Sequence, residues 1–332
     1  MSKTMNNQNQ MNQLLSAIFA SDSILLFAHI SPDGDTLGSA IALKLRLESI
    51  NKQVVLILDG DIPTYLDFLP SDGIVKPENA PDPSLFDLAI AVDVSCSDRM
   101  GGGEAIFKRT KMTAQIDHHQ TNDGYAQINF IDGQAPATAV LIYRMFMDQD
   151  QRPTLQESIC LYTALSTDTG NFIYESTNAE CFEMMAMLMC SGLPLAKYSR
   201  ILFRQKEHAF VRLLGKALPS LHMFADGVGA GLRLSQSDME QVDAKAGHTD
   251  GLIDYAIDVT GVKVAYFVRE TPEGRVKASL RAIAPYRVDE AAMQFGGGGH
   301  RLAAGCGLDM TLDEAQTAIE KALIEAYRST EV

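Results

Sequence analysis

Histidine and aspartate side chains, which bind metal ions and transfer protons, gather in four short clusters in the first half of the chain. The clusters read HISPDGD at 29–35, AVDVS at 91–95, IDHHQ at 116–120 and STDTGNF at 166–172. Singly, two of them have ordinary explanations, because Asp-Gly-Asp is a common turn and an Asp after an apolar strand is often a turn residue. Asp35 is equally suited to capping a helix. Two adjacent histidines beside an aspartate are hard to explain by packing.

Together the clusters offer a mixed set of carboxylates and imidazoles. The candidate metal ligands are His29, Asp33, Asp35, Asp93, His118 and Asp168. Such donors suit divalent ions such as Mn²⁺ better than a thiolate zinc site would. Six ligands are too many for one ion that keeps an open position, but they suit two ions sharing a bridging carboxylate. Two ions about 3.5–4 Å apart can hold both sides of a phosphate under in-line attack and lower the pKa of a water molecule between them.

Alternating strands and helices must bring these clusters together. Buried strands are predicted at 23–30, 53–58, 85–94 and 111–116, and helices at 36–50, 137–148 and 155–166. This rhythm predicts an α/β fold with a mostly parallel sheet flanked by helices. Because ligands bind beyond the carboxyl ends of the strands in such sheets, we expect the four clusters at one edge.

The sequence pattern changes near residue 222, where short predicted strands alternate with turns. Strands are predicted at 221–224, 229–234, 262–270 and 276–282, and helices near 288–295 and 312–327. We therefore predict a metal-binding catalytic domain at 1–190, a helical connector at 191–215 and a smaller α/β domain at 216–332.

Four consecutive glycines stand near the end of the chain, in FGGGGHRLAAG at 295–305. A run of amides without side chains can curl around an anion and donate N–H groups to phosphate oxygens. A flexible linker is the alternative, although a short glycine run followed by charged and then apolar residues makes a poor linker. Arg281, on the strand predicted at 276–282, has a side chain that can bind phosphate in a bidentate manner. The candidate substrate-binding residues are Arg99, Arg281, Gly297, Gly298, Gly299 and His300.

Composition narrows the class of protein. The 332 residues are 46 % hydrophobic and 21 % charged, which is ordinary for a globular protein, and the net charge is −14. Such a charge argues against binding long duplex nucleic acid through a basic surface. The five cysteines include no CxxC pair, no apolar run reaches the roughly 18 residues of a membrane helix, and the polar first 13 residues lack a signal-peptide core. We expect a cytoplasmic protein that does not enter a membrane.

The four clusters, in this order and at strand ends, resemble the motifs of the DHH phosphoesterase superfamily, which is named for the triplet at 117–119. The resemblance implies two Mn²⁺ ions, with Mg²⁺ as the alternative. The implied ligands are His29 and Asp33 for one ion, Asp35, His118 and Asp168 for the other, and Asp93 between the two. It also implies that Asp117 orients His118 and that His119 faces the substrate, so that His119, Asp93 and Asp117 are the catalytic residues. The glycine-rich stretch is similar to the DHHA1 domain, so the resemblance spans roughly residues 14–328.

Length and domain content favour one branch of this superfamily. Family II pyrophosphatases carry a different second domain, RecJ exonucleases are usually longer, and membrane-bound cyclic dinucleotide phosphodiesterases have transmembrane segments. The compact arrangement of NrnA-type enzymes remains. It implies a Mn²⁺-dependent phosphoesterase that hydrolyses short oligoribonucleotides to mononucleotides and removes the 3′-phosphate of pAp. Such an enzyme can be a monomer or a homodimer. The alternatives are a soluble phosphodiesterase for cyclic di-AMP or pApA, a RecJ-like single-strand exonuclease, and a non-catalytic nucleotide-binding module.

Overall fold

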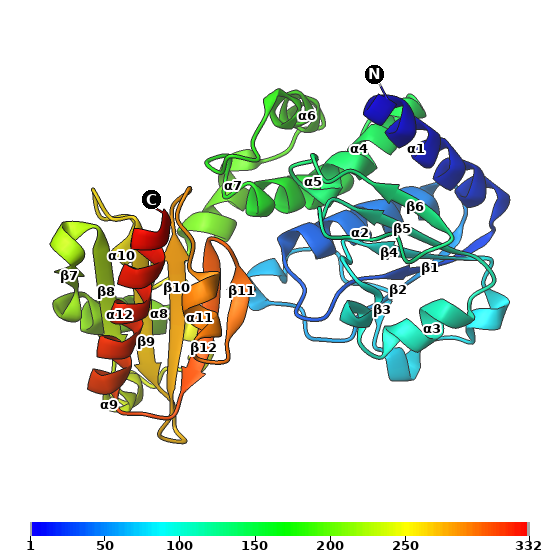
Figure 1. Ribbon diagram of the computed structural model, residues 1–332. Coiled ribbons are helices and arrows are strands. Elements are labelled where there is room, and N and C mark those ends of the chain that lie inside the picture. The colour runs from blue at the N-terminus through cyan, green and yellow to red at the C-terminus, as the bar shows by residue number, and fades with distance from the viewer. Residues whose placement is uncertain (1, 331–332) are drawn as a thin grey trace. The chain divides into compact units, whose positions relative to one another are not determined.

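The chain folds into two compact units, Met1–Gln205 and Lys206–Val332 (Figure 1). The structure is a computed structural model that describes residues 2–330, with side chains from residue 6 onward. The division between the units falls within the segment expected to be a connector. No helix within residues 2–330 is long and apolar enough to cross a membrane.

A six-stranded parallel sheet forms the centre of the first unit. Its strands, in spatial order, are β3 (Ile74–Val75), β2 (Gln53–Ile57), β1 (Ser23–Phe27), β4 (Leu88–Val92), β5 (Thr113–Asp117) and β6 (Ile128–Ile131). Every residue of β4 is buried, as expected for a central strand covered on both faces. The predicted parallel sheet is confirmed.

Helices cover both faces of this sheet because side chains alternate along each strand. Leu25 and Phe27 of β1 pack toward α3 (Gly103–Arg109), whereas Ile24 and Leu26 join the core beneath the opposite helices. The remaining helices of the unit are α1 (Ser2–Ala20), α2 (Gly34–Ser49), α4 (Thr138–Asp148), α5 (Leu155–Asp168), α6 (Ala179–Cys190) and α7 (Leu195–Ser199).

Helices α2 and α5 approach each other closely at Gly38. A Cβ atom at Gly38 would lie 2.4 Å from the carbonyl oxygen of Cys160, so only glycine permits this approach. The contact matters for the site because α2 begins, and α5 ends, at the carboxyl edge of the sheet. It fixes the two ends relative to each other.

The second unit contains a mixed six-stranded sheet. In spatial order its strands are β11 (Gly298–His300), β12 (Ala303–Leu308), β10 (Val276–Ala282), β9 (Val264–Glu270), β8 (Gly229–Leu234) and β7 (His222–Phe224). Only β8 and β9 pair in parallel, and the other neighbours are antiparallel. The predicted smaller α/β unit is confirmed.

Apolar residues on the two faces of this second sheet pack under different helices. One face meets α11 (Asp289–Met293) and α12 (Leu312–Thr330), where Ile319 and Leu323 are fully buried. The other face meets α8 (His208–Ala217), α9 (Gln236–Glu240) and α10 (Asp254–Ile257). The sheet is therefore covered on both sides, and its β11 edge stays exposed.

Candidate metal centre

All four clusters lie at the carboxyl edge of the first sheet or at helix ends beside it. His29 follows β1, and Asp33 is the N-cap of α2, whose first turn contains Asp35. Asp93 follows β4 directly, and Asp168 is the last residue of α5. The remaining cluster begins with Asp117 at the end of β5 and continues with His118 and His119.

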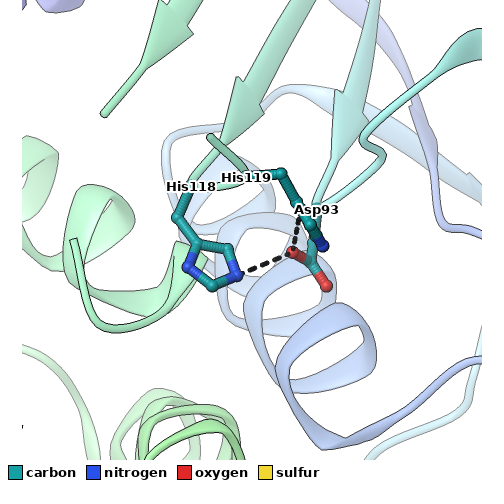
Figure 2. A group of neighbouring side chains, drawn as sticks. All are labelled: Asp93, His118 and His119. Carbon is teal, nitrogen blue, oxygen red and sulfur yellow. Dashed lines mark ion pairs between the residues drawn. The ribbon is translucent and has the colours of Figure 1, made fainter. Parts of the chain in front are cut away.

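The six candidate ligands separate into two sets that meet at Asp93. The atoms of each set that can bind a metal lie within 4.8 Å of one another. The sets are His29, Asp33 and Asp93 on one side, Asp35, His118 and Asp168 on the other, and a third group of Asp93, His118 and His119 between them. Asp93 Oδ2 lies 3.7 Å from His29 Nε2. Asp93 Oδ1 lies 3.7 Å from His118 Nε2 (Figure 2). The two oxygens of one carboxylate therefore face two different sets of donors.

Two threonine hydroxyls hold Asp93 in this orientation. Thr36 Oγ1 donates to Asp93 Oδ2 at 2.6 Å, and Thr138 Oγ1 donates to Oδ1 at 2.9 Å. Asp93 itself has a left-handed backbone (φ 60°), which aspartate tolerates better than most residues and which is frequent at functional sites. The carboxylate is 2 % exposed, so it cannot exchange these partners for water.

The amino terminus of α4 holds Asp35. The backbone N–H of Thr138 donates to Asp35 Oδ2 at 2.7 Å, and that of Ala139 donates to Oδ1 at 3.1 Å. Ser39 Oγ adds a third hydrogen bond at 2.9 Å. A helix amino terminus is a favourable place for a carboxylate because its N–H groups lack partners within the helix. Thr138 contacts both buried carboxylates, one through its hydroxyl and the other through its backbone.

The carboxylates of the cluster are electrostatically unfavourable in their charged forms unless cations are bound beside them. Burial, followed by the charge of Asp168, raises the pKa of Asp35 to about 7, and burial likewise raises the pKa of Asp93 and brings that of Asp168 to about 6. Burial lowers the pKa of His118, but the neighbouring carboxylates outweigh it and raise this pKa to about 9. Three neighbouring carboxylates, two of them buried, retain protons unless other positive charge is present. Divalent ions supply that charge, so the donor set fits them.

Access to the cluster is uneven. The side chains of Asp33, Asp168 and His119 are 54 %, 32 % and 28 % exposed, whereas those of Asp35 and Asp93 are buried. One side of the cluster is therefore embedded in the fold and the other is open to a ligand.

Asp117 differs from its expected role. Its Oδ1 lies 2.8 Å from His119 Nδ1, and its Oδ2 accepts from Asn122 at 2.6 Å. His118 Nδ1 lies instead 3.2 Å from the carbonyl oxygen of Ala135. Residues two positions apart in an extended segment project to the same side, which brings Asp117 against His119 rather than against its direct neighbour. This hydrogen bond is the main reason that the pKa of His119 is raised.

Arg99 lies beside the cluster. Its Nη2 is 3.3 Å from His29 Nδ1, and its carbonyl oxygen accepts from the N–H of Ile30 at 2.7 Å.

The candidate phosphate-binding residues of the second unit gather at one edge of its sheet. Gly298–His300 forms the edge strand β11, so this part of the glycine run is paired rather than a free loop. Arg281 of β10 and His300 of β11 both pair with Ala303 of the strand between them. Directly paired residues share a face, so these two side chains project from the same face, about 10 Å apart across two strand spacings. Gly297 is close-packed, since a Cβ there would lie 2.2 Å from the carbonyl oxygen of Gly305.

Sequence reasoning missed the threonines that hold the carboxylates. Thr36 and Thr138 lie at or near the starts of helices, where a hydroxyl residue is ordinarily interpreted as a cap. The sequence does place Thr36 just after the acidic cluster at 29–35 and Thr138 at the start of the helix at 138–148, and these positions could have indicated a role. The positions alone do not tell which carboxylate each threonine contacts.

Known protein families match both units of the chain. The model of the DHH family, N-terminal domain, matches residues 23–167, and the DHHA1 domain model matches residues 233–327. A bifunctional oligoribonuclease and PAP phosphatase NrnA from Thermus thermophilus is 30 % identical over 310 residues, covering 91 % of this chain and 89 % of that protein. The protein of the same name from Bacillus subtilis is 23 % identical and covers 91 % and 94 %.

Two further similarities concern ligand class and fold. A cyclic-di-AMP phosphodiesterase GdpP from Geobacillus thermodenitrificans is 23 % identical over 93 % of this chain, which spans 48 % of that protein. The crystal structure of an exopolyphosphatase-related protein from Bacteroides fragilis superposes with a TM-score of 0.89 and 25 % identity, covering 96 % of both chains.

Proposed function

The chain belongs to the DHH family of phosphoester hydrolases, with a DHH domain followed by a DHHA1 domain, and we propose that it is a Mn²⁺-dependent enzyme that hydrolyses short oligoribonucleotides and removes the 3′-phosphate of pAp. The observation that carries this proposal is the position of Asp93, whose two oxygens face two separate sets of metal-binding side chains. The names of the relatives from Thermus and Bacillus supply the substrate class.

The proposed ligands follow the two donor sets. His29 and Asp33 would hold one ion, Asp35, His118 and Asp168 would hold the second, and Asp93 would be shared by both. When bound, such ions neutralise the phosphoryl oxygens and lower the pKa of water. In the hydrolysis, the oxygen of a water molecule bonds to phosphorus, the ester P–O bond breaks, and the leaving oxygen takes a proton.

His119 is the side chain we assign to that leaving oxygen. It is partly exposed at the edge of the cluster, and Asp117 accepts a hydrogen bond from its Nδ1 when that nitrogen carries the proton. The same contact raises the pKa of His119, so the ring retains a proton on Nε2 for transfer more readily than a free imidazole. Arg99 lies beside His29, so its positive charge is close enough to the metal cluster to bind a phosphoryl oxygen of the substrate.

A cyclic dinucleotide is the second candidate substrate. The similarity to a cyclic-di-AMP phosphodiesterase favours it, although this chain spans only about half of that relative. The dinucleotide pApA and cyclic di-AMP both contain a phosphodiester attached to adenosine, so the same metal cluster could serve either. The homodimer, the cytoplasmic location and the domain limits at 1–190, 191–215 and 216–332 stay predictions.

Turnover measurements decide between these activities. Purified protein, stripped of metal and then given Mn²⁺ or Mg²⁺, is assayed with pAp, pApA and cyclic di-AMP beside the Asp93→Ala variant. We expect Mn²⁺-dependent release of phosphate from pAp and of AMP from pApA, and no turnover by the variant. Faster hydrolysis of cyclic di-AMP would favour the second candidate. Undiminished turnover by Asp93→Ala would contradict the shared-ligand assignment.

A further inference from the structure

Three basic side chains form an exposed row along one face of a helix in the first unit. Lys197 lies in α7, and Arg200 and Arg204 begin and end the π-helical turn η5 (Arg200–Arg204) that continues α7. Their spacing of three and four residues places them on one side of the helix, and all three are exposed. We call them the basic row. The opposite side of the helix faces the core, where Tyr198 is buried. Turns of π-helix are rare and frequently occur at functional sites.

The basic row differs in charge from the rest of the chain. The net charge is −14 and 42 residues are acidic, yet none of residues 184–206 is acidic. Within the part of the chain that the structure describes, no side chain of the row forms an ion pair. Lys197 Nζ lies instead 4.9 Å from the centre of the Tyr198 ring. A row of unpaired cations attracts a ligand that carries several negative charges, and the backbone of a nucleic acid strand is such a ligand.

One segment of the first unit connects the open side of the metal cluster with the basic row. It follows β2 and includes the 3₁₀ turn η1 (Thr64–Leu66). Its first part lies against the loop of Asp33, since a Cβ atom at Gly60 would be 3.6 Å from the ring of the proline that precedes Asp33. Its last part packs on α7, where the ring centres of Phe68 and Tyr198 are 5.0 Å apart, and η1 itself contacts η5.

An exposed aromatic ring, that of Tyr65 in η1, lies along this connection. Tyr65 is 44 % exposed, and Asp33 has the most exposed side chain of the candidate metal ligands. Burial, followed by the charge of Asp33, raises the pKa of the Tyr65 hydroxyl, which agrees with their closeness. Proteins bind single-stranded nucleic acid with aromatic rings, on which bases stack, beside cations that follow the backbone. The surface from Asp33 to η5 has both features.

We propose that the basic row binds backbone phosphates of an oligoribonucleotide whose scissile phosphate lies at the metal cluster. The proposal rests on the proposed function, because that function makes the oligoribonucleotide the substrate. Since η1 separates the row from Asp33, the row meets phosphates beyond those of a dinucleotide. The row is about 10 Å long, because a helix rises about 1.5 Å per residue. A strand of a few nucleotides therefore covers it, and a longer strand gains no further contact with it.

The test removes two cations of the row and compares substrates of different length. The variant is Arg200→Gln/Arg204→Gln, at exposed positions whose side chains do not support the core. The matched control, Arg109→Gln/Arg152→Gln, removes the same charge from two other exposed arginines. Arg109 ends α3 before β5 begins, and Arg152 precedes α5, so both lie toward the amino edge of the sheet, away from the metal cluster.

The measured quantity is kcat/KM for pApA and for the first cleavage of a five-residue oligoribonucleotide, at several concentrations of KCl. At low salt we expect the value for the oligomer to fall about tenfold in the row variant, the loss expected for two exposed ion pairs. The slope of log kcat/KM against log salt concentration should become shallower by about 1.4, since each phosphate contact of a single strand contributes about 0.7. Hydrolysis of pApA by the row variant, and of both substrates by the control, should be unchanged.

Several results would overturn the assignment of the basic row. These are equal losses for both substrates, an unchanged salt slope, an equal loss in the control, or a wild-type protein that hydrolyses pApA but not the oligomer. The mass of each variant in solution is measured as well. A changed mass in the row variant would also overturn the assignment, because it would mark the row as a contact between two copies of the chain. Wild-type protein that hydrolyses neither substrate would instead contradict the proposed function.

Discussion

Replacing Thr138 with valine isolates one hydrogen bond that supports the metal centre. Thr138 is fully buried, and its hydroxyl donates to Asp93 Oδ1 at 2.9 Å while its backbone N–H donates to Asp35. Valine keeps the shape, the branching and the backbone N–H, and removes only the hydroxyl. A hydrogen bond to a charged group is worth about 1.5–3 kcal/mol, and loss of a side chain that orients a ligand typically costs about 10- to 100-fold in metal affinity. We expect Mn²⁺ affinity to fall by that factor.

Calorimetric titration of the metal-free protein with Mn²⁺ measures this affinity without relying on turnover. Thr138→Ser restores the hydroxyl and should recover most of the affinity. The matched control is Thr163→Val, because Thr163 is equally buried but its hydroxyl donates to the carbonyl oxygen of Ile159 in α5. Wild-type affinity in a folded Thr138→Val protein would refute the reasoning, as would an equal loss in Thr163→Val.

Three further outcomes are expected. Arg281→Ala should lower kcat/KM by about 10- to 100-fold, the cost of a lost charge-assisted hydrogen bond, and leave calorimetric Mn²⁺ affinity unchanged; loss of metal binding would contradict its assignment to the substrate. The metal-free protein should lose stability from about pH 4 to 9, because the pKa of Asp35 is raised to about 7 and that of His118 to about 9, so folding retains protons that rising pH removes. Melting temperatures in EDTA should therefore fall between pH 5.5 and pH 8 while the increase caused by Mn²⁺ grows, and the opposite trend would count against the buried cluster. Oligoribonucleotides of two to five residues should be cleaved much faster than a 20-mer, because a net charge of −14 repels phosphates outside the site; labelled substrates compared by kcat/KM decide this.

The sequence predicted the candidate metal ligands because most of these residues follow the ends of strands, which can be recognised from the sequence. Strand ends are marked by the change from apolar to polar residues, and a parallel sheet places such ends together, so the six candidate ligands were identified as one group. The pairing of Asp117 with His119 depends on side-chain direction at the end of β5, which the neighbouring positions alone did not reveal.

Contacts between distant segments were beyond the sequence pattern. Thr138 meets Asp35 and Asp93 only because α4 starts beside the start of α2 and the end of β4, and the sequence separations exceed 40 residues. The glycine run was expected as a loop, but pairing of Gly298–His300 with β12 places two of its four glycines in an edge strand.

Counting bound metal tests the two-ion centre most directly. The protein and its Asp93→Ala variant are dialysed to equilibrium against Mn²⁺, and the metal retained per chain is measured by atomic absorption. Two ions per wild-type chain, with weakened binding of both in the variant, are expected because Asp93 faces both donor sets. A single ion per wild-type chain, or two tightly held ions in Asp93→Ala, would contradict the account.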